Sequence, residues 1–177
     1  MLEIGQKAPD FALPGVDGQT HRLSDLLAEH RAVAVIFSCN HCPYVRAWEE
    51  RMVDLQRAYA DRGVALVAIN PNDAQRYPDD SFEAMQQRAR DQGFNFRYLR
   101  DESQEVARAY GAERTPHVYL LDSDGILRYR GAIDDNYERP EAVRHPYLRD
   151  ALDAVLAGDS PAVETTPAVG CTIKWRA

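Results

Sequence analysis

Two cysteines separated by two residues carry the most evident chemistry of this sequence. Cys39 and Cys42 lie in the segment Cys-Asn-His-Cys-Pro. The preceding run, 32–37, is apolar and β-branched, and residues 44–60 have helical spacing. The pair therefore lies where a buried strand ends and a helix begins, and there free N–H groups and the helix dipole favour a thiolate. A Cys-x-x-Cys pair in this setting is typical of a thiol–disulfide redox centre.

The two cysteines have different expected roles. We expect the cysteine nearest the helix start to have a lowered pKa and to be reactive. Cys39 is the candidate nucleophile, which would form a mixed disulfide, and Cys42 is the candidate resolving thiol, one turn along. His41 is a candidate for redox tuning, because a cation beside the pair would stabilise the thiolate. The alternatives are an inert buried pair and a solvated histidine with little effect.

A third cysteine, Cys171, lies close to the C-terminus. It could be a third redox cysteine that folds back to Cys39, or a route to an intermolecular disulfide. It could instead be a small buried hydrophobic residue that anchors the tail. Ile173 and Trp175 are apolar neighbours that already explain docking of the tail, which favours the anchoring role.

The elements that must position these residues alternate along the chain. An N-terminal hairpin precedes the main sheet, and a strand, a long helix and a second strand then form a βαβ unit with parallel strands. The expected strands are 32–37, 64–69, 96–99, 117–121 and 126–130, and the expected helices are 44–60, 82–92, 102–110 and 147–157. This order predicts an α/β fold, with a central mixed β-sheet flanked by helices on both faces and an N-terminal β-hairpin extension.

Composition sets outer bounds on the function. Hydrophobic residues make up 45% and charged residues 28% of the 177 residues, which is ordinary for a globular chain. We expect one domain over residues 1–157 and a C-terminal tail, 158–177, that docks on it. The net charge of −7 argues against a nucleic-acid partner. No charged and apolar leader and no membrane span is visible, so we expect a cytoplasmic protein without a membrane partner.

Several motifs together resemble the thioredoxin fold. Cys39-x-x-Cys42-Pro43 follows a strand, and Thr115-Pro116 precedes a β-hairpin. Three further segments resemble the thioredoxin-like redoxin family, which includes the alkyl hydroperoxide reductase/thiol-specific antioxidant proteins and the thiol-disulfide interchange proteins. These segments are residues 5–11, 110–116 and 121–131, and the resemblance extends over about residues 5–157. It implies a cis Pro116 beside the redox pair, with Thr115 and Pro116 in contact with substrate.

The chain also departs from the patterns of this family. Ile36 and Ala32 stand where peroxiredoxins carry the threonine and proline that orient a peroxide. Ser38 and Val33 stand where thioredoxin carries a tryptophan and a buried aspartate. Val45 stands where the interchange proteins often carry a glutamate, so the usual proton acceptor for the second cysteine is not visible. These departures weaken both a peroxidase and an ordinary thioredoxin interpretation.

The sequence therefore predicts an enzyme, a thiol–disulfide oxidoreductase. Its expected partners are a disulfide-containing protein, or a small thiol or hydroperoxide, and a thiol reductant, and we expect no cofactor and no metal. One alternative is a peroxiredoxin-like hydroperoxide reductase with antioxidant activity. The other is a metal-carrying module of the same fold, in which His117 or His145 would have to complete a zinc site with the cysteine pair.

Overall fold

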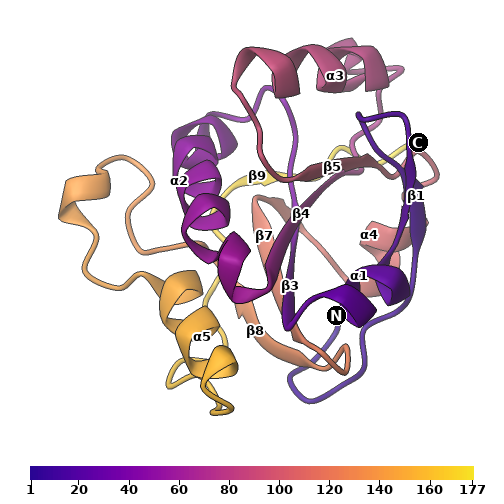
Figure 1. The fold of residues 1–177 in the computed structure, drawn as a ribbon. Helices are drawn as coiled ribbons and strands as arrows, with labels where there is room; N and C mark the ends of the chain where they lie inside the picture. The colour runs from indigo at the N-terminus through magenta and orange to yellow at the C-terminus, as the bar shows by residue number, and fades with distance from the viewer.

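A five-stranded mixed sheet forms the centre of the molecule in the computed structural model, which describes residues 1–177 (Figure 1). The strands lie in the order β5-β4-β3-β7-β8. Their bounds are β3 (Ala32–Phe37), β4 (Val64–Asn70), β5 (Arg97–Arg100), β7 (His117–Asp122) and β8 (Leu127–Gly131). Strand β3 is parallel to β4 and antiparallel to β7. The predicted mixed α/β sheet is confirmed.

The remaining elements surround this sheet. They are β1 (Ala12–Pro14), β2 (Thr20–Arg22), α1 (Leu23–Glu29), α2 (Pro43–Tyr59), α3 (Phe82–Asp91), α4 (Glu105–Tyr110), β6 (Arg114–Thr115), α5 (Tyr147–Leu156) and β9 (Cys171–Thr172). Strands β1 and β2 pair antiparallel, which confirms the N-terminal hairpin. Helix α4 begins three residues later than predicted, because Gln104 has a left-handed φ of 66° that a helix cannot include.

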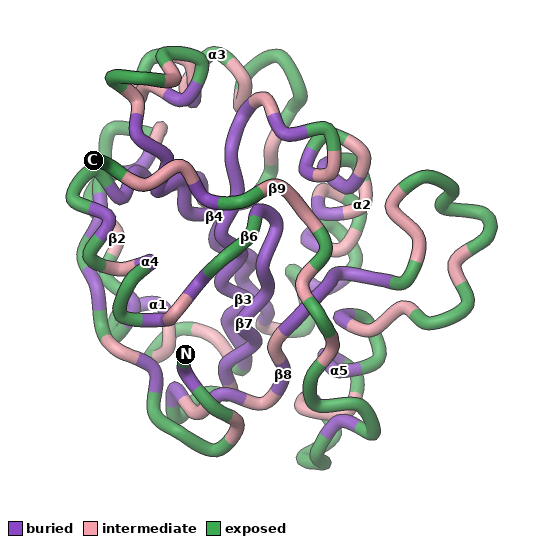
Figure 2. Tube along the Cα trace, turned by 180° about the vertical axis from the view of Figure 1, so that it is seen from behind, coloured by how far each residue is buried: buried purple, intermediate pink, exposed green.

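The hydrophobic core has two halves, one on each face of the sheet. Alternate residues of a strand point to opposite faces. Ala34 and Ile36 of β3 therefore face α2, α3 and α5, while Val35 and Phe37 face α1, α4 and the N-terminal hairpin. Figure 2 shows β3, β4 and β7 as the most continuously buried part of the chain. Burial on both faces explains why β3 is apolar at every position.

The residues after α5 run over the outside of the fold and reach the end of the sheet near β6 (Figure 2). Strand β9 pairs antiparallel with β6, so that Cys171 lies opposite Thr115. Ile173 is buried in the half of the core that contains α4, and the guanidinium of Arg108 lies 4.5 Å from the centre of the Trp175 ring. The tail therefore brings its cysteine to the end of the sheet at which α2 begins.

None of the helices combines the length and the apolar character that crossing a bilayer requires.

Candidate redox site

Cys39 and Cys42 lie in the short loop between β3 and α2, and both are free thiols. Only 2% of Cys39 and 1% of Cys42 are exposed. Helix α2 begins at Pro43, which needs no hydrogen-bond partner at this position because proline has no N–H. Cys42 is therefore the N-cap residue and the cysteine nearest the helix start, while Cys39 lies three residues earlier.

Thr115 contacts both sulfur atoms. The Sγ atom of Cys39 lies 3.4 Å from Thr115 Oγ1, and the Sγ atom of Cys42 lies 3.3 Å from the Thr115 carbonyl oxygen. Strand register explains this proximity, because Phe37 pairs with His117 and the residues beyond that pair adjoin each other. The Thr115–Pro116 peptide bond is cis, as the family resemblance implied. The structure thus brings together the two cysteines, Thr115 and Pro116.

The pKa values of the two thiols move in opposite directions. The neighbouring Cys42 sulfur, burial and the charge of Asp80 all raise the pKa of Cys39. The Cys39 thiol, followed by the thiol and the N–H of Cys171 and the N–H of Val45, lowers the pKa of Cys42 well below its ordinary range. The helix N-terminus acts in the same sense, because its free N–H groups favour a thiolate at Cys42, the cysteine that adjoins the helix.

A buried carboxylate, Asp80, lies beside the loop that carries the pair. Asp80 is 0% exposed, and its Oδ2 atom lies 2.9 Å from Nδ1 of His41. Its carboxylate accepts hydrogen bonds from the Asn40 N–H at 2.7 Å and from Nδ2 of Asn72 at 3.0 Å. The candidate tuning residue His41 is therefore held against a fixed negative charge. Buried carboxylates are tolerated when hydrogen bonds of this kind satisfy them.

Sequence reasoning missed Asp80 as a site residue. It lies in a polar loop with several other aspartates, and nothing in that loop distinguishes one carboxylate from the next. Val45, in the helix, offers no proton acceptor for the second cysteine. The structure instead supplies a buried carboxylate from the connection between β4 and α3.

Hydrogen bonds of Asn40 hold the loop between the cysteines. Its Oδ1 atom accepts from the Tyr98 hydroxyl at 2.7 Å, and its Nδ2 donates to the Asp79 carbonyl at 2.7 Å. Its own carbonyl accepts from Nε of Arg46 at 2.9 Å. Because Asn40 is itself buried, these bonds fix the backbone that positions both sulfur atoms.

Cys171 is half-buried and packs against the small cluster formed by Cys39, Cys42 and Val45. Burial, and then the Cys42 sulfur, raises the pKa of Cys171 to about 11. All three cysteines of the chain therefore meet at the start of α2.

The two histidines of the metal-carrying alternative have other contacts. Nδ1 of His117 accepts from the Glu113 N–H at 3.3 Å, and burial lowers the pKa of His117 to about 4. His145 stacks on Tyr147, with 5.9 Å between the ring centres. No group of three or more His, Cys, Asp or Glu side chains is arranged to hold a metal ion.

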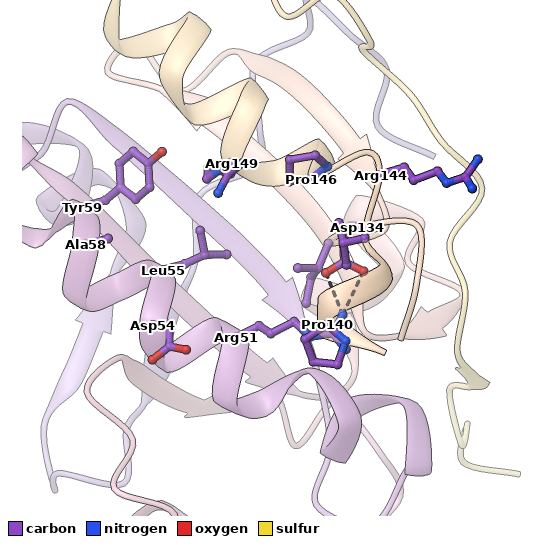
Figure 3. A pocket seen from close by; sticks show the side chains of 12 residues that line it. Arg51, Asp54, Leu55, Ala58, Tyr59, Asp134, Pro140, Arg144, Pro146 and Arg149 are labelled. Atoms are coloured by element: carbon purple, nitrogen blue, oxygen red, sulfur yellow. Dashed lines mark hydrogen bonds and ion pairs between the residues drawn. The ribbon is translucent and has the colours of Figure 1, made fainter. Parts of the chain in front are cut away.

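A cavity of about 510 Å³ lies away from the cysteines, between α2, α5 and the loop that precedes α5 (Figure 3). Arg51 lines it and pairs with Asp134 at 2.7 Å, and Nε1 of Trp48 donates to the same carboxylate at 3.0 Å. Asp134 therefore has structural partners on α2. The cysteine pair lies at the other end of that helix, outside this cavity.

The sequence profile described as AhpC/TSA family matches residues 4–130. Thiol-disulfide oxidoreductase ResA of Geobacillus kaustophilus (strain HTA426) is 30% identical over 127 residues, which are 72% of this chain and 68% of that protein.

Solved structures give the same result for the fold. A crystal structure of an uncharacterized conserved protein from Geobacillus kaustophilus is 44% identical, covers 99% of this chain and 94% of its own, and has a TM-score of 0.92. A putative thiol:disulfide interchange protein DsbE from Chlorobium tepidum is 25% identical, covers 89% and 98%, and has a TM-score of 0.68. The predicted thioredoxin fold is confirmed by these similarities.

Proposed function

The chain belongs to the AhpC/TSA family, and from this premise we propose that it is a thiol–disulfide oxidoreductase whose reactive unit is Cys39 and Cys42. One observation carries the proposal: both sulfur atoms lie at the start of a helix and contact the same residue, Thr115. The relative from Geobacillus kaustophilus that is named a thiol-disulfide oxidoreductase supports the reaction class.

The proposed reaction is a pair of thiol–disulfide exchanges. The Cys39 thiolate attacks one sulfur of a substrate disulfide, forms a mixed disulfide and releases the other substrate sulfur as a thiolate. The Cys42 sulfur then attacks Cys39 and releases the remaining substrate sulfur. The substrate gains two electrons, and the protein is left with a Cys39–Cys42 disulfide. A thiol reductant returns the pair to its reduced form.

Thr115 provides hydrogen bonds for the reactive form of the pair. The pKa of Cys39 is raised and that of Cys42 is lowered, so Cys39 has to lose a proton before it can attack. Transfer of that proton to the Cys42 sulfur gives a Cys39 thiolate that the Thr115 hydroxyl can donate to, over 3.4 Å. It also gives a Cys42 thiol that donates to the Thr115 carbonyl over 3.3 Å. Thr115 thus stabilises both groups after the transfer.

Substrate binding and redox tuning complete the proposal. Thr115 and Pro116 are the proposed substrate contacts, because Thr115 contacts both sulfur atoms and Pro116 is the next residue of the chain. His41 is the proposed tuning residue, and its side chain is 30% exposed, so it can face a bound partner. The partners are a disulfide-containing protein or a small disulfide, and a thiol reductant.

A disulfide is a better proposed substrate than a hydroperoxide. Peroxide reduction requires polar groups that orient the peroxide at the attacking sulfur. Ile36 and Ala32 supply none, because both are fully buried apolar residues of β3. The Thr115 hydroxyl does lie near the Cys39 sulfur, but the proposal assigns this residue to contact with the substrate disulfide.

Reduction of insulin disulfides with dithiothreitol as the electron donor tests the proposal. Cys39→Ser is expected to abolish turnover, and Cys42→Ser is expected to accumulate a mixed disulfide between Cys39 and substrate. Ala60→Ser, at an exposed position just after α2, is the matched control and should keep full turnover. Full turnover by Cys39→Ser would overturn the proposal. A mixed disulfide trapped on Cys42 in Cys39→Ser, with none on Cys39 in Cys42→Ser, would exchange the two roles.

A further inference from the structure

We propose that Cys171 is a third redox cysteine, which takes over the disulfide from Cys39 and so locks the C-terminal strand over the site as a Cys42–Cys171 disulfide. This inference rests on the proposed function, because the oxidised Cys39–Cys42 pair is its starting point. It assigns a regulatory step to the tail, whereas the sequence favoured a role of Cys171 only in anchoring the tail to the domain.

The tail occupies the strand edge beside the redox pair. Strand β9 pairs with β6 in the register Thr115↔Cys171 and Arg114↔Thr172. An open strand edge is a natural binding site for an extended peptide. Here a segment of the same chain occupies this edge, and it presents a cysteine at the position opposite Thr115. The tail therefore sits where an extended substrate would bind.

Gly170 allows this close approach. A Cβ atom added at Gly170 would lie 2.1 Å from the Thr115 carbonyl oxygen, far inside any normal contact. The residue before Cys171 must therefore be a glycine for the strand to reach β6. Close approach of the backbone is what places the third cysteine at the pair.

Cys171 meets the pair on the Cys42 side. Both its thiol and its N–H act on the Cys42 sulfur and help to lower the pKa of Cys42. The Cys42 sulfur in turn raises the pKa of Cys171. The contacts give the same neighbourhood: the Cys42 sulfur lies 3.3 Å from the Thr115 carbonyl, and Cys171 pairs with Thr115 and packs against the cluster that contains Cys42.

The tail covers the pair and is secured beyond the cysteine. Cys39 and Cys42 are at most 2% exposed, and Cys171 of the tail is among the residues packed against them, so departure of β9 would open one side of the pair to a substrate disulfide. The N–H of Ile173 donates to the Glu113 carbonyl at 3.1 Å. The N–H of Lys174 donates to Oδ1 of Asn72 at 2.9 Å, and Nδ2 of Asn72 donates to Asp80. The closed tail is thus connected to the carboxylate that faces His41.

The proposed step is an exchange with no net change in oxidation state. The Cys171 thiolate attacks the Cys42 sulfur of the Cys39–Cys42 disulfide, and the bond between Sγ of Cys39 and Sγ of Cys42 breaks. Cys39 leaves as a thiolate and takes up a proton equivalent to the one that Cys171 released. In the oxidised pair Cys42 no longer carries the charge that raises the pKa of Cys171, so the attacking thiolate forms more readily. A thiol reductant reopens the tail.

Peptide mass mapping after reaction with oxidised glutathione tests this inference. Trypsin leaves Cys39 and Cys42 on the peptide 32–46 and Cys171 on the peptide 150–174. In Cys39→Ser, glutathione on Cys42 should be displaced by Cys171, which joins the two peptides through Cys42 and Cys171. In Cys42→Ser, the matched variant, Cys39 should keep its glutathione and the peptides should stay separate. Wild-type protein treated with one equivalent of oxidised glutathione should also yield the joined peptides.

The outcomes separate the inference from the proposed function. The inference alone is overturned if the wild-type protein reduces insulin disulfides but the two peptides stay unjoined in both the wild type and Cys39→Ser. Equal joining in Cys39→Ser and Cys42→Ser also overturns it, because the tail would then lack preference for Cys42. Wild-type protein that leaves insulin disulfides intact overturns the proposed function, and the regulatory inference fails with it.

Discussion

The Oδ2 atom of Asp80 lies 2.9 Å from Nδ1 of His41, although the two residues are separated by a strand, a helix and a loop. Asp80 is fully buried, whereas His41 is partly exposed at the surface beside the cysteines. A fixed negative charge thus lies on one side of the redox pair, and a group that can carry a positive charge lies against it. Two substitutions at this contact should act on the pair in opposite directions.

Asp80→Asn is expected to make Cys39 more reactive, because the Asp80 charge is one of the causes that raise the pKa of Cys39. The rate of alkylation of Cys39 by iodoacetamide at neutral pH should increase by up to about tenfold, the effect of one pKa unit on the thiolate fraction. Peptide mass mapping measures this rate. Asp79→Asn, at the exposed neighbouring position, is the control and should leave the rate unchanged. A slower rate in Asp80→Asn would contradict the prediction.

His41→Gln is expected to make the Cys39–Cys42 disulfide less oxidising. Without the imidazole, the Asp80 carboxylate loses a partner that lies 2.9 Å away, its charge acts more strongly on the pair, and the thiolate of the reduced form loses stability. The reduction potential against the glutathione couple should become more negative, by about 30 mV for each tenfold change in the equilibrium constant. His145→Gln, which alters a histidine beside Tyr147 at the start of α5, is the control. A shift to a less negative potential would show that His41 acts in the other direction.

Thr115→Val is expected to slow the attack step while leaving the fold intact. Valine keeps the shape of threonine but removes the hydroxyl that lies 3.4 Å from Cys39, and the backbone carbonyl beside Cys42 stays in place. A hydrogen bond to a charged group contributes about 1.5–3 kcal/mol, so kcat/KM for insulin disulfides should fall by at least about tenfold. Thr172→Val, at an exposed position of β9, serves as the control. Unchanged kcat/KM would exclude the proposed role of the hydroxyl.

The stability of the reduced protein is expected to depend on pH with a definite sign. The pKa of Cys42 is depressed in the folded protein, so ionisation of Cys42 stabilises the fold. This stabilisation is fully present above the pKa of the unfolded chain, about 8.5, and is lost as the pH falls through the pKa of the folded protein. The pKa of Cys39 is raised, so its contribution is present below about 8.5 and is lost as the pH rises further. Stability should therefore increase towards pH 8 and decrease beyond it.

Urea denaturation of the reduced wild type and of Cys42→Ser measures this dependence. The difference in the free energy of unfolding between the two proteins should increase with pH below 8, by at most about 1.4 kcal/mol per pH unit for one proton. A difference that stays constant from pH 5 to pH 8 would mean that the charge does not rest on Cys42 in the folded protein.

Most of the fold could be predicted from the sequence, because the signals that determine it are local. The apolar run of β3 and the helical spacing that follows it are patterns within a few residues, and so are the turn residues between β7 and β8. The predicted start of α4, at residue 102, was wrong for a reason of the same scale, because Gln104 adopts a left-handed conformation and the helix begins only at Glu105. Asp101 accepts the N–H of Ala107 at 2.9 Å and so satisfies a free donor in the first turn of this helix.

The sequence by itself determined the reactive pair, its place at a helix start and the fold around it. Only the tertiary structure decided the direction in which the pKa of each thiol moves and which groups surround the pair. Thr115, Asp80 and Cys171 come from three distant segments: the family resemblance indicated Thr115, the sequence left the role of Cys171 open, and nothing in it connected Asp80 to the pair. Burial and charges within a few ångströms determine a pKa, and these distances exist only once the chain has folded.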